Sequence, residues 1–169
     1  ALPGQEMKIV DAQGNELPAG QTGEIVIKGP NVMLGYYGNE QATADAIVDG
    51  WLHTGDLGNM DEDGYFFIAG RSKEMIIRGG ENIYPKEIEE VVYTHPAVAD
   101  AAVCGVPDKF YGEEVRAYIV LKPGAAATEQ EILDYCLERL AKYKCPKSVA
   151  VLEDMPKTAT GKILKRKLV

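Results

Sequence analysis

One stretch, residues 69–90 (AGRSKEMIIRGGENIYPKEIEE), constrains the fold more than any other because it combines several backbone signals. Gly70 and the pair Gly79–Gly80 can adopt positive φ and let another backbone or a ligand approach closely. Between them, residues 74–78 favour a short strand with an apolar centre. Pro85 fits the first position of a helix. We interpret the stretch as a hinge followed by a loop that reaches an active site, although the pattern alone favours a strand, a turn and a helix without chemistry.

The composition allows either one domain or two small ones. The 169 residues are 46% hydrophobic, which is ample for a core, and no apolar run approaches the length of a membrane span. The first residue is Ala, and no charged and apolar leader follows it. We therefore expect a piece of a longer, cytoplasmic protein.

The cysteines and histidines argue against a disulfide framework and against a metal site. Cys104, Cys136 and Cys145 are odd in number and lack CxxC spacing, so a reducing environment is expected. Cys136 falls on an apolar helical face and is expected in the core. His53 and His95 are far apart in the sequence and have no neighbouring ligand set.

The net charge of −8 hides an asymmetry between the body and the tail of the chain. Residues 1–141 hold ten Lys or Arg against twenty-four Asp or Glu, whereas residues 142–169 hold eight against two. A basic end on an acidic body often indicates a polyanionic partner, such as nucleotide phosphates, nucleic acid or a membrane surface. Charge alone also fits lysines that are simply solvated.

The N-terminal part is predicted to be β-rich. Residues 6–11 and 24–28 alternate apolar and polar side chains, which favours antiparallel strands. Asn39 is expected to cap a short helix that runs to about Val48. Residues 57–69 predict a hairpin.

The turn of that hairpin, residues 61–64 (DEDG), resembles the start of a calcium loop. An EF-hand loop beginning at Asp61 would need a glutamate at position 72, where the chain has Ser72, so a turn is expected instead.

The C-terminal part predicts an α+β layer with helices on a mostly antiparallel sheet. Thr128 and Glu131 have the spacing of a helix capping box. The domain boundary is predicted near Gly70 and Arg71, with residues 1–70 as the β-rich part and residues 71–169 as the small α+β domain. The expected elements are a helix at 85–94, strands at 97–106 and 114–121, a helix at 129–142 and a strand at 148–152. The expected apolar stripe of the second helix is Ile132, Leu133, Cys136, Leu137 and Leu140.

The basic tail contains the segment PKTATGKILKRK, residues 156–167. A phosphate-binding P-loop is rejected, because that motif needs Gly at 156 and Ser or Thr at 163, where the chain has Pro156 and Ile163. What remains is Lys162 on a loop expected to be mobile. An ammonium delivered in this way suits a phosphate or a charged transition state, although the segment taken alone fits an ordinary exposed lysine better.

Five segments, in order, resemble the C-terminal third of the adenylate-forming enzymes. They are GEIVIKGPNVMLGYY, GWLHTGD, GRSKEMIIRGGENIYPKEIE, GVPDKFYGE and PKTATGKILKR, and together they cover essentially the whole chain. The sequences of these segments are most similar to those of fatty-acyl or aryl CoA ligases, which suggests a role in fatty acid metabolism. The resemblance implies that residues 1–70 complete a β-barrel subdomain of a larger N-terminal domain, and that residues 71–169 form a mobile C-terminal domain.

The resemblance also implies the chemistry. A carboxylic acid attacks the α-phosphate of ATP to give an acyl-adenylate and pyrophosphate, and the thiol of coenzyme A then displaces AMP. The C-terminal domain is expected to swing between the two steps. The Mg²⁺ ligands, the ATP phosphate loop and the acyl pocket are expected in the missing N-terminal part, so this chain alone should be inactive.

The site residues implied by the resemblance lie at five places. Asp56 matches the aspartate that binds the ribose hydroxyls, and Arg71 matches an arginine of the ribose region. Lys73 matches the hinge. Gly79–Gly80 matches the loop beside the pantetheine tunnel, and Lys162 matches the lysine that bridges substrate carboxylate and α-phosphate.

Two positions depart from the family pattern. His53 stands where many relatives have an aromatic residue, and it is given no acid–base role. Asn82 stands where some relatives have an arginine facing coenzyme A phosphate, and Arg78 or a tail lysine is the suggested substitute. The alternatives are an adenylation domain that loads a carrier protein and a non-catalytic binding or regulatory module.

Overall fold

The computed structural model describes residues 3–169, which divide into two compact units. Unit 1 ends at Lys73, and unit 2 comprises Glu74–Val169. The domain boundary at residues 70 and 71 remains a prediction, and the division between the compact units falls a few residues later. None of the helices within residues 3–169 is long and apolar enough to cross a membrane.

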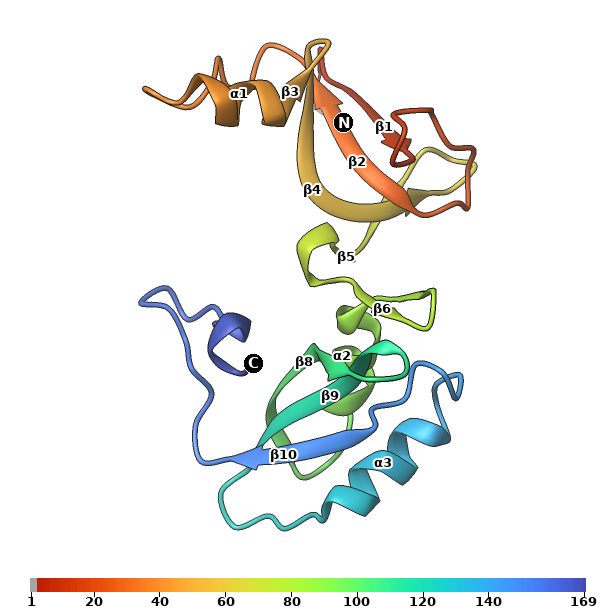
Figure 1. Ribbon diagram of the computed structural model, residues 1–169, viewed down its shortest axis with the longest axis vertical. Helices are drawn as coiled ribbons and strands as arrows, with labels where there is room; N and C mark the ends of the chain where they lie inside the picture. The colour runs from red at the N-terminus through yellow and green to blue at the C-terminus, as the bar shows by residue number, and fades with distance from the viewer. Residues whose placement is uncertain (1–2) are drawn as a thin grey trace. The chain divides into compact units, whose positions relative to one another are not determined.

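Unit 1 is built on one antiparallel sheet of five strands with a single short helix (Figure 1). The strand order is β1-β2-β4-β3, and β5 pairs with β4. Its core includes Ile9, Val10, Ile25 and Val26, all nearly inaccessible to solvent. The predicted β-rich character is therefore confirmed. The elements are β1 Glu6–Val10, β2 Gly23–Lys28, α1 Glu40–Ala46, β3 Ile47–Val48, β4 Trp51–Met60 and β5 Phe66–Arg71.

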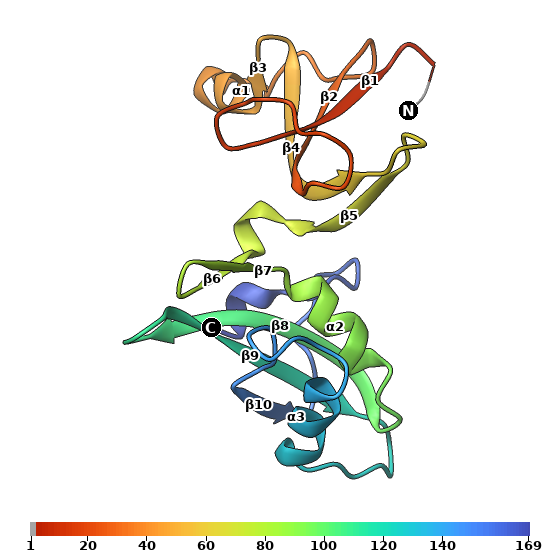
Figure 2. The same cartoon turned by 90° about the vertical axis from the view of Figure 1, so that its right-hand side faces the viewer.

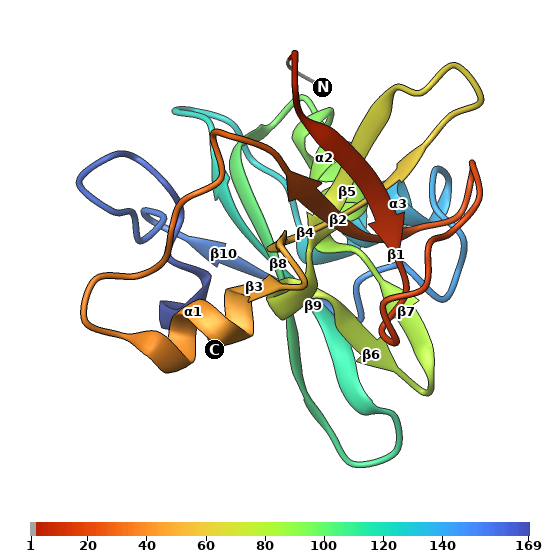
Figure 3. The same ribbon diagram turned by 90° about the horizontal axis from the view of Figure 1, so that it is seen from above.

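Helix α1 begins where the sequence predicts and ends earlier. The Asn39 side chain accepts a hydrogen bond from the backbone N–H of Ala42 at 3.0 Å, which confirms the predicted cap. The helix stops at Ala46 because Ile47 is extended and pairs with Leu52 as the start of β3. Figure 3 shows α1 leading directly into β3. β-branched side chains favour this strand, which the sequence analysis had included in the helix.

The β4–β5 hairpin turns on Asp61. Its Oδ1 accepts hydrogen bonds from the backbone N–H groups of Asp63 at 3.1 Å and Tyr65 at 2.8 Å. An aspartate side chain that bonds the backbone two residues ahead is a standard turn device. The DEDG segment is thus a turn, as predicted.

Unit 2 holds a second five-stranded sheet of order β10-β9-β6-β7, with β8 paired to β9. Only the β10–β9 pair is parallel, so the predicted α+β class with a mostly antiparallel sheet is confirmed. Its elements are β6 Ile76–Arg78, β7 Glu81–Ile83, α2 Pro85–Tyr93, β8 Val98–Asp108, β9 Gly112–Leu121, α3 Glu129–Leu137, β10 Ser148–Leu152 and the 3₁₀ turn η2 Lys165–Lys167. A further 3₁₀ turn, η1 Ser72–Glu74, leads into it.

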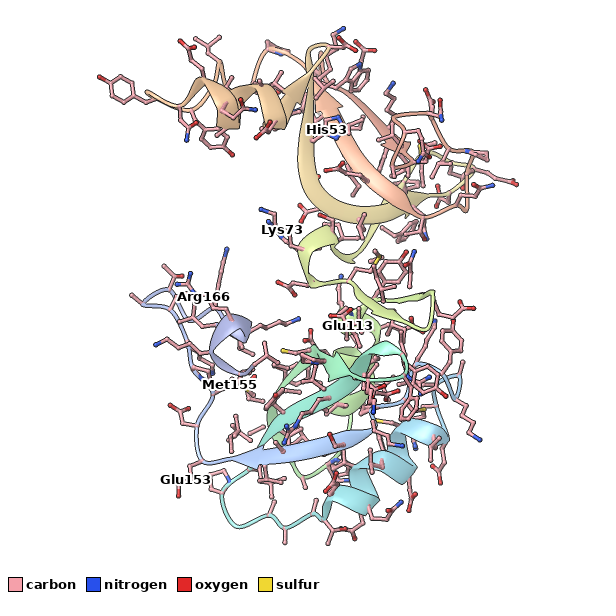
Figure 4. The ribbon with its side chains drawn as sticks, in the orientation of Figure 1. His53, Lys73, Glu113, Glu153, Met155 and Arg166 are labelled. Carbon is pink, nitrogen blue, oxygen red and sulfur yellow. The ribbon has the colours of Figure 1, made fainter. Side chains whose placement is uncertain are left out.

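The two faces of this sheet are covered differently, because successive side chains of a strand point to opposite faces. One face packs on α2 and α3, as Figure 2 shows. The other is covered by the C-terminal tail, which contributes the buried Met155 together with Ile163 and Leu168; Figure 4 labels Met155. The helix-side core includes Ile76, Ile83, Ile88, Val92, Val103, Val115, Ile119, Ile132 and Cys136. The tail-side cluster is built on Ala102, Cys104 and Tyr118.

Helix α3 shows the predicted capping box between Thr128 and Glu131 but is shorter than expected. It ends at Leu137 because Arg139 N–H bonds the carbonyl of Cys136, which tightens the last turn. Leu137 is 49% exposed, so its place in the predicted apolar stripe is wrong.

Candidate functional site

Asp56 and Arg71 form an ion pair that the strand register creates. They are directly paired residues of β4 and β5, and Arg71 Nε lies 2.9 Å from Asp56 Oδ1. The Asp56 backbone N–H donates to Thr54 Oγ1 at 3.1 Å, and the Thr54 hydroxyl donates to the Ile25 carbonyl at 2.7 Å. The neighbouring β2 strand therefore fixes the backbone that carries the aspartate.

A pocket of about 590 Å³ lies beside this pair within unit 1. Arg71 and Lys73 line it, whereas Asp56 is not among the lining residues and is connected to the pocket only by its ion pair with Arg71. Figure 4 shows Lys73 on the short turn after β5. The remaining lining residues are Glu24, Tyr36, Ala42, Asp45, Ala46, His53, Thr54, Gly55 and Ser72.

Glu24 organises one wall of the pocket, and the sequence analysis did not single it out. One of its oxygens, Oε2, lies 2.7 Å from His53 Nδ1, and the other accepts the backbone N–H of Gly55 at 2.9 Å. Gly55 has φ of +71°, a conformation that favours glycine. The contact with Glu24 thus holds the ring of His53, which Figure 4 labels. The only sequence signal for Glu24 was its place at the start of a strand.

The Gly79–Gly80 pair makes the tight turn between β6 and β7. Their φ angles are +59° and +90°, and Arg78 pairs with Glu81 across the turn. A two-residue hairpin loop with positive φ at both positions matches the twist of the strands. A Cβ at Gly79 would lie 3.1 Å from the ring of Tyr111, whereas one at Gly80 would meet no atom within 4 Å. The turn is confirmed, and its role beside a tunnel remains a prediction.

Arg78 is held in place beside this turn. Its Nε pairs with Glu114, and its guanidinium lies 4.5 Å from the centre of the Tyr111 ring. Glu114 is itself buried. Of the two suggested substitutes for the missing coenzyme A arginine, a tail lysine is therefore the freer side chain.

Lys162 stands on a closed hairpin, where the sequence suggested a mobile loop. Lys157 bridges to Ile163, and the Thr158 N–H donates to the Lys162 carbonyl at 2.8 Å. The Lys162 N–H returns a bond to Thr158 Oγ1 at 3.1 Å, and Gly161 closes the turn with φ of +83°. The Lys162 side chain is exposed and has no partner within residues 3–169. A hydrogen-bonded hairpin thus presents an exposed ammonium.

Three of the eight basic residues of the tail, residues 142–169, form ion pairs within unit 2. Lys144, Lys157 and Lys165 contact carboxylates of the acidic body at 2.6–2.8 Å. Within the described part of the chain, Lys162, Arg166 and Lys167 have no such partner, and Figure 4 labels Arg166 on η2. Part of the positive tail therefore stabilises the fold, and only the remainder is available to an anionic ligand.

The site residues thus form two sets. Unit 1 carries Asp56, Arg71 and Lys73, and unit 2 carries the Gly79–Gly80 turn and Lys162.

Two family models match the chain. Residues 87–162 match the AMP-binding enzyme C-terminal domain, and residues 1–37 match the AMP-binding enzyme model. The chain therefore belongs to the AMP-binding, or adenylate-forming, enzymes, as the resemblance predicted. It spans about one third of the length of the relatives it matches.

Particular relatives are CoA ligases. The chain is 48% identical to the long-chain-fatty-acid–CoA ligase of Bacillus subtilis (strain 168), over 99% of this chain and 30% of that protein. It is 50% identical to the 2-succinylbenzoate–CoA ligase of Bacillus cereus (strain Q1), over 94% of this chain and 33% of that protein. ATP-bound MatB from Rhodopseudomonas palustris superposes with a TM-score of 0.94 at 43% identity, covering 99% of this chain and 34% of that one.

Proposed function

We propose that this chain is the C-terminal part of an AMP-forming acid–CoA ligase. The complete enzyme joins a carboxylic acid to ATP, releases pyrophosphate, and transfers the acyl group from AMP to the thiol of coenzyme A. The observation that carries the proposal is Lys162, an ammonium on a closed hairpin that has no carboxylate partner within residues 3–169, whereas Lys157 and Lys165 on either side of it are paired. Charge stabilisation at a reacting phosphate needs such a cation, positioned before the reaction begins.

Each site residue has a role that its chemistry suits. The Asp56 carboxylate accepts hydrogen bonds from both ribose hydroxyls, and Arg71 keeps that carboxylate oriented. Lys162 bridges the substrate carboxylate and the α-phosphate. It acts as a charge and not as a base, because a protonated ammonium has no lone pair. Removing the hydroxyl-accepting carboxylate would weaken nucleotide binding, whereas removing the ammonium would raise the barrier of the adenylation step.

The second step uses a different part of unit 2. We assign the Gly79–Gly80 turn to the passage of the pantetheine arm, which the absence of side chains keeps open. Lys73 is assigned to the hinge at which the C-terminal domain rotates between steps, since a few residues at an element's end can absorb such a change.

Mg²⁺ is expected to accompany ATP. No group of three or more His, Cys, Asp or Glu side chains within residues 3–169 is arranged to hold a metal ion. We therefore derive no step through the metal and assign its ligands to residues outside this chain.

The acid itself is proposed only as a class, fatty-acyl or aryl. A relative named for long-chain fatty acids and one named for 2-succinylbenzoate are 48% and 50% identical to the chain. Two relatives named for such different acids match almost equally well, so the residues that select the acid are assigned to the remainder of the enzyme.

The function is tested with the complete enzyme and a panel of carboxylic acids. Acid-dependent pyrophosphate release followed by a CoA thioester, identified by mass spectrometry, is expected. Thioester formed only on a carrier protein would favour the carrier-loading alternative, and no pyrophosphate release with any acid would favour a non-catalytic module. The chain alone should form no thioester with acid, ATP, Mg²⁺ and coenzyme A, and steady turnover would contradict this.

A further inference from the structure

Lys165 connects two acidic residues that lie far from it in the sequence. Its Nζ lies 2.6 Å from Glu74 Oε2 and 2.8 Å from Glu89 Oε1. Glu74 is the first residue of unit 2, directly after Lys73, and Glu89 belongs to α2. One ammonium therefore holds the start of unit 2, a helix and the tail together.

The Lys165–Glu89 half of this contact is less exposed than an ordinary surface ion pair, whereas the Glu74 side chain is 43% exposed. The Lys165 side chain is 21% exposed and that of Glu89 is 18% exposed. Glu89 Oε1 also accepts the backbone N–H of Val103 in β8 at 2.8 Å. Burial alone would lower the pKa of Lys165, but the two carboxylates outweigh it and raise the pKa, so the ammonium stays charged.

The same lysine follows Lys162 by one short turn, and the intervening backbone is fixed. The Leu164 N–H donates to the Pro156 carbonyl at 2.7 Å, which closes the base of the Lys162 hairpin. Ile163 and Leu168 pack against the tail-side cluster of the sheet. A displacement of Lys165 would therefore be passed to Lys162.

We propose that Lys165 is a positioning residue that couples the hinge to Lys162. Because it holds Glu74 and Glu89 at once, rotation of the backbone at Lys73 carries α2, the sheet and the Lys162 hairpin as one body. The inference rests on the proposed roles of Lys73 and Lys162 and adds a residue that neither role requires.

The test uses the complete enzyme with four variants. Lys165→Met removes the charge but keeps the length of the side chain, and Lys165→Arg keeps the charge. Glu74→Gln weakens only the contact to the hinge side. Lys167→Met is the matched control, because Lys167 lies on the same 3₁₀ turn and has no partner within residues 3–169.

The adenylation kcat, followed by pyrophosphate exchange, should fall about 10- to 100-fold in Lys165→Met, since an ångström of misplacement can cost that much. The KM for ATP and the rate of thioester formation from supplied acyl-adenylate should change less than about threefold. Lys165→Arg should recover most of the rate, Glu74→Gln should lose about threefold to tenfold, and Lys167→Met should match the parent.

Hydrogen exchange supplies a readout that does not depend on turnover. Backbone amides of residues 157–164 should exchange faster in Lys165→Met than in Lys167→Met. Unchanged exchange and adenylation in Lys165→Met would overturn the inference, and a neutral Glu74→Gln would overturn the coupling to the hinge. If instead Lys162→Ala left adenylation intact, the proposed function would fail, which is a distinct outcome.

Discussion

Arg71 and Asp56 face each other across the β4–β5 ladder, with the guanidinium nitrogen 2.9 Å from the carboxylate. The Arg71 side chain is 62% exposed, so the pair contributes little to folding, about 1 kcal/mol or less. We propose that the pair orients the Asp56 carboxylate toward the nucleotide and does little to stabilise the fold.

Asp56→Asn should therefore impair nucleotide use without unfolding the protein. We expect kcat/KM for ATP to fall about 10- to 100-fold, because an amide accepts fewer hydrogen bonds from the ribose and loses its ion pair. The melting temperature should shift by only a degree or two. Asp63→Asn is the control, since its exposed side chain has no assigned role. Equal ATP kinetics in the two variants would contradict the nucleotide assignment.

Lys162→Ala should separate the two half-reactions. Adenylation should fall at least about 100-fold, because a preorganised cation at the reacting phosphate is lost. Thioester formation from supplied acyl-adenylate should stay within about threefold. The comparison is with Lys167→Ala, which removes an exposed tail charge without an assigned role. If both half-reactions decline together in Lys162→Ala, the role in adenylation is wrong.

Gly80→Leu should impair thioester formation and spare adenylation, which is the reverse of the effect expected for Lys162→Ala. A side chain at φ of +90° strains the turn by about 1–2 kcal/mol, although no atom of the chain lies within 4 Å of the new Cβ. Gly124→Leu is a matched control, because Gly124 also has positive φ and open surroundings. Thioester formation should drop in Gly80→Leu and not in Gly124→Leu, as measured by CoA-dependent release of AMP. Parallel behaviour of the two would remove the tunnel role.

Lys73→Pro should slow the overall reaction by restricting the hinge. Proline fixes its own φ and restricts Ser72, and both residues belong to the turn that leads into unit 2. The full cycle should slow about tenfold or more, whereas at least one isolated half-reaction stays close to that of Lys73→Ala. A proline variant as fast as the alanine variant over the full cycle would exclude a hinge here.

Acid should destabilise unit 2 through Asp100. Its carboxylate accepts from the Tyr93 hydroxyl at 2.5 Å and contacts Lys157 Nζ at 2.6 Å. Burial raises the pKa of Asp100, but these partners outweigh it and hold the pKa below its usual 3.8. Stabilisation by a carboxylate with a lowered folded pKa is complete above its unfolded pKa and is lost as the pH falls through the folded one.

Asp100→Asn should therefore be less stable than the parent near neutral pH, by about 1 kcal/mol, and the difference should shrink below about pH 4. Thermal unfolding between pH 2 and pH 7 measures this, with Asp63→Asn as control. A constant difference across that range would show that the charge of Asp100 is not responsible.

Local signals in the sequence predicted most of the fold. Helix starts were predicted correctly from Asn39, Pro85 and the Thr128–Glu131 capping box. Each acts locally, because it either accepts a hydrogen bond from a backbone N–H group of the first turn or fixes a helical φ. Helix ends were predicted poorly. Leu137 continues the apolar periodicity, yet the helix ends there through backbone hydrogen bonds that no residue type in the sequence predicts.

The candidate site residues were chosen from sequence motifs, and the contacts that support them were not predicted. Asp56, Arg71 and Lys162 stood in recognisable segments of sequence. Glu24 was missed because its two contacts come from a neighbouring strand, and Lys165 was missed because its partners are distant in the chain. Such contacts exist only once the sheets have formed.

The packing of the tail on the second face of the sheet has a practical consequence for deletion studies. Truncation before Met155 would expose Ala102, Cys104 and Tyr118, which would leave an aggregation-prone apolar surface on the strands. Its inactivity would then report aggregation as much as the missing lysine, so shortened forms are poor substitutes for point mutants in dissecting this domain.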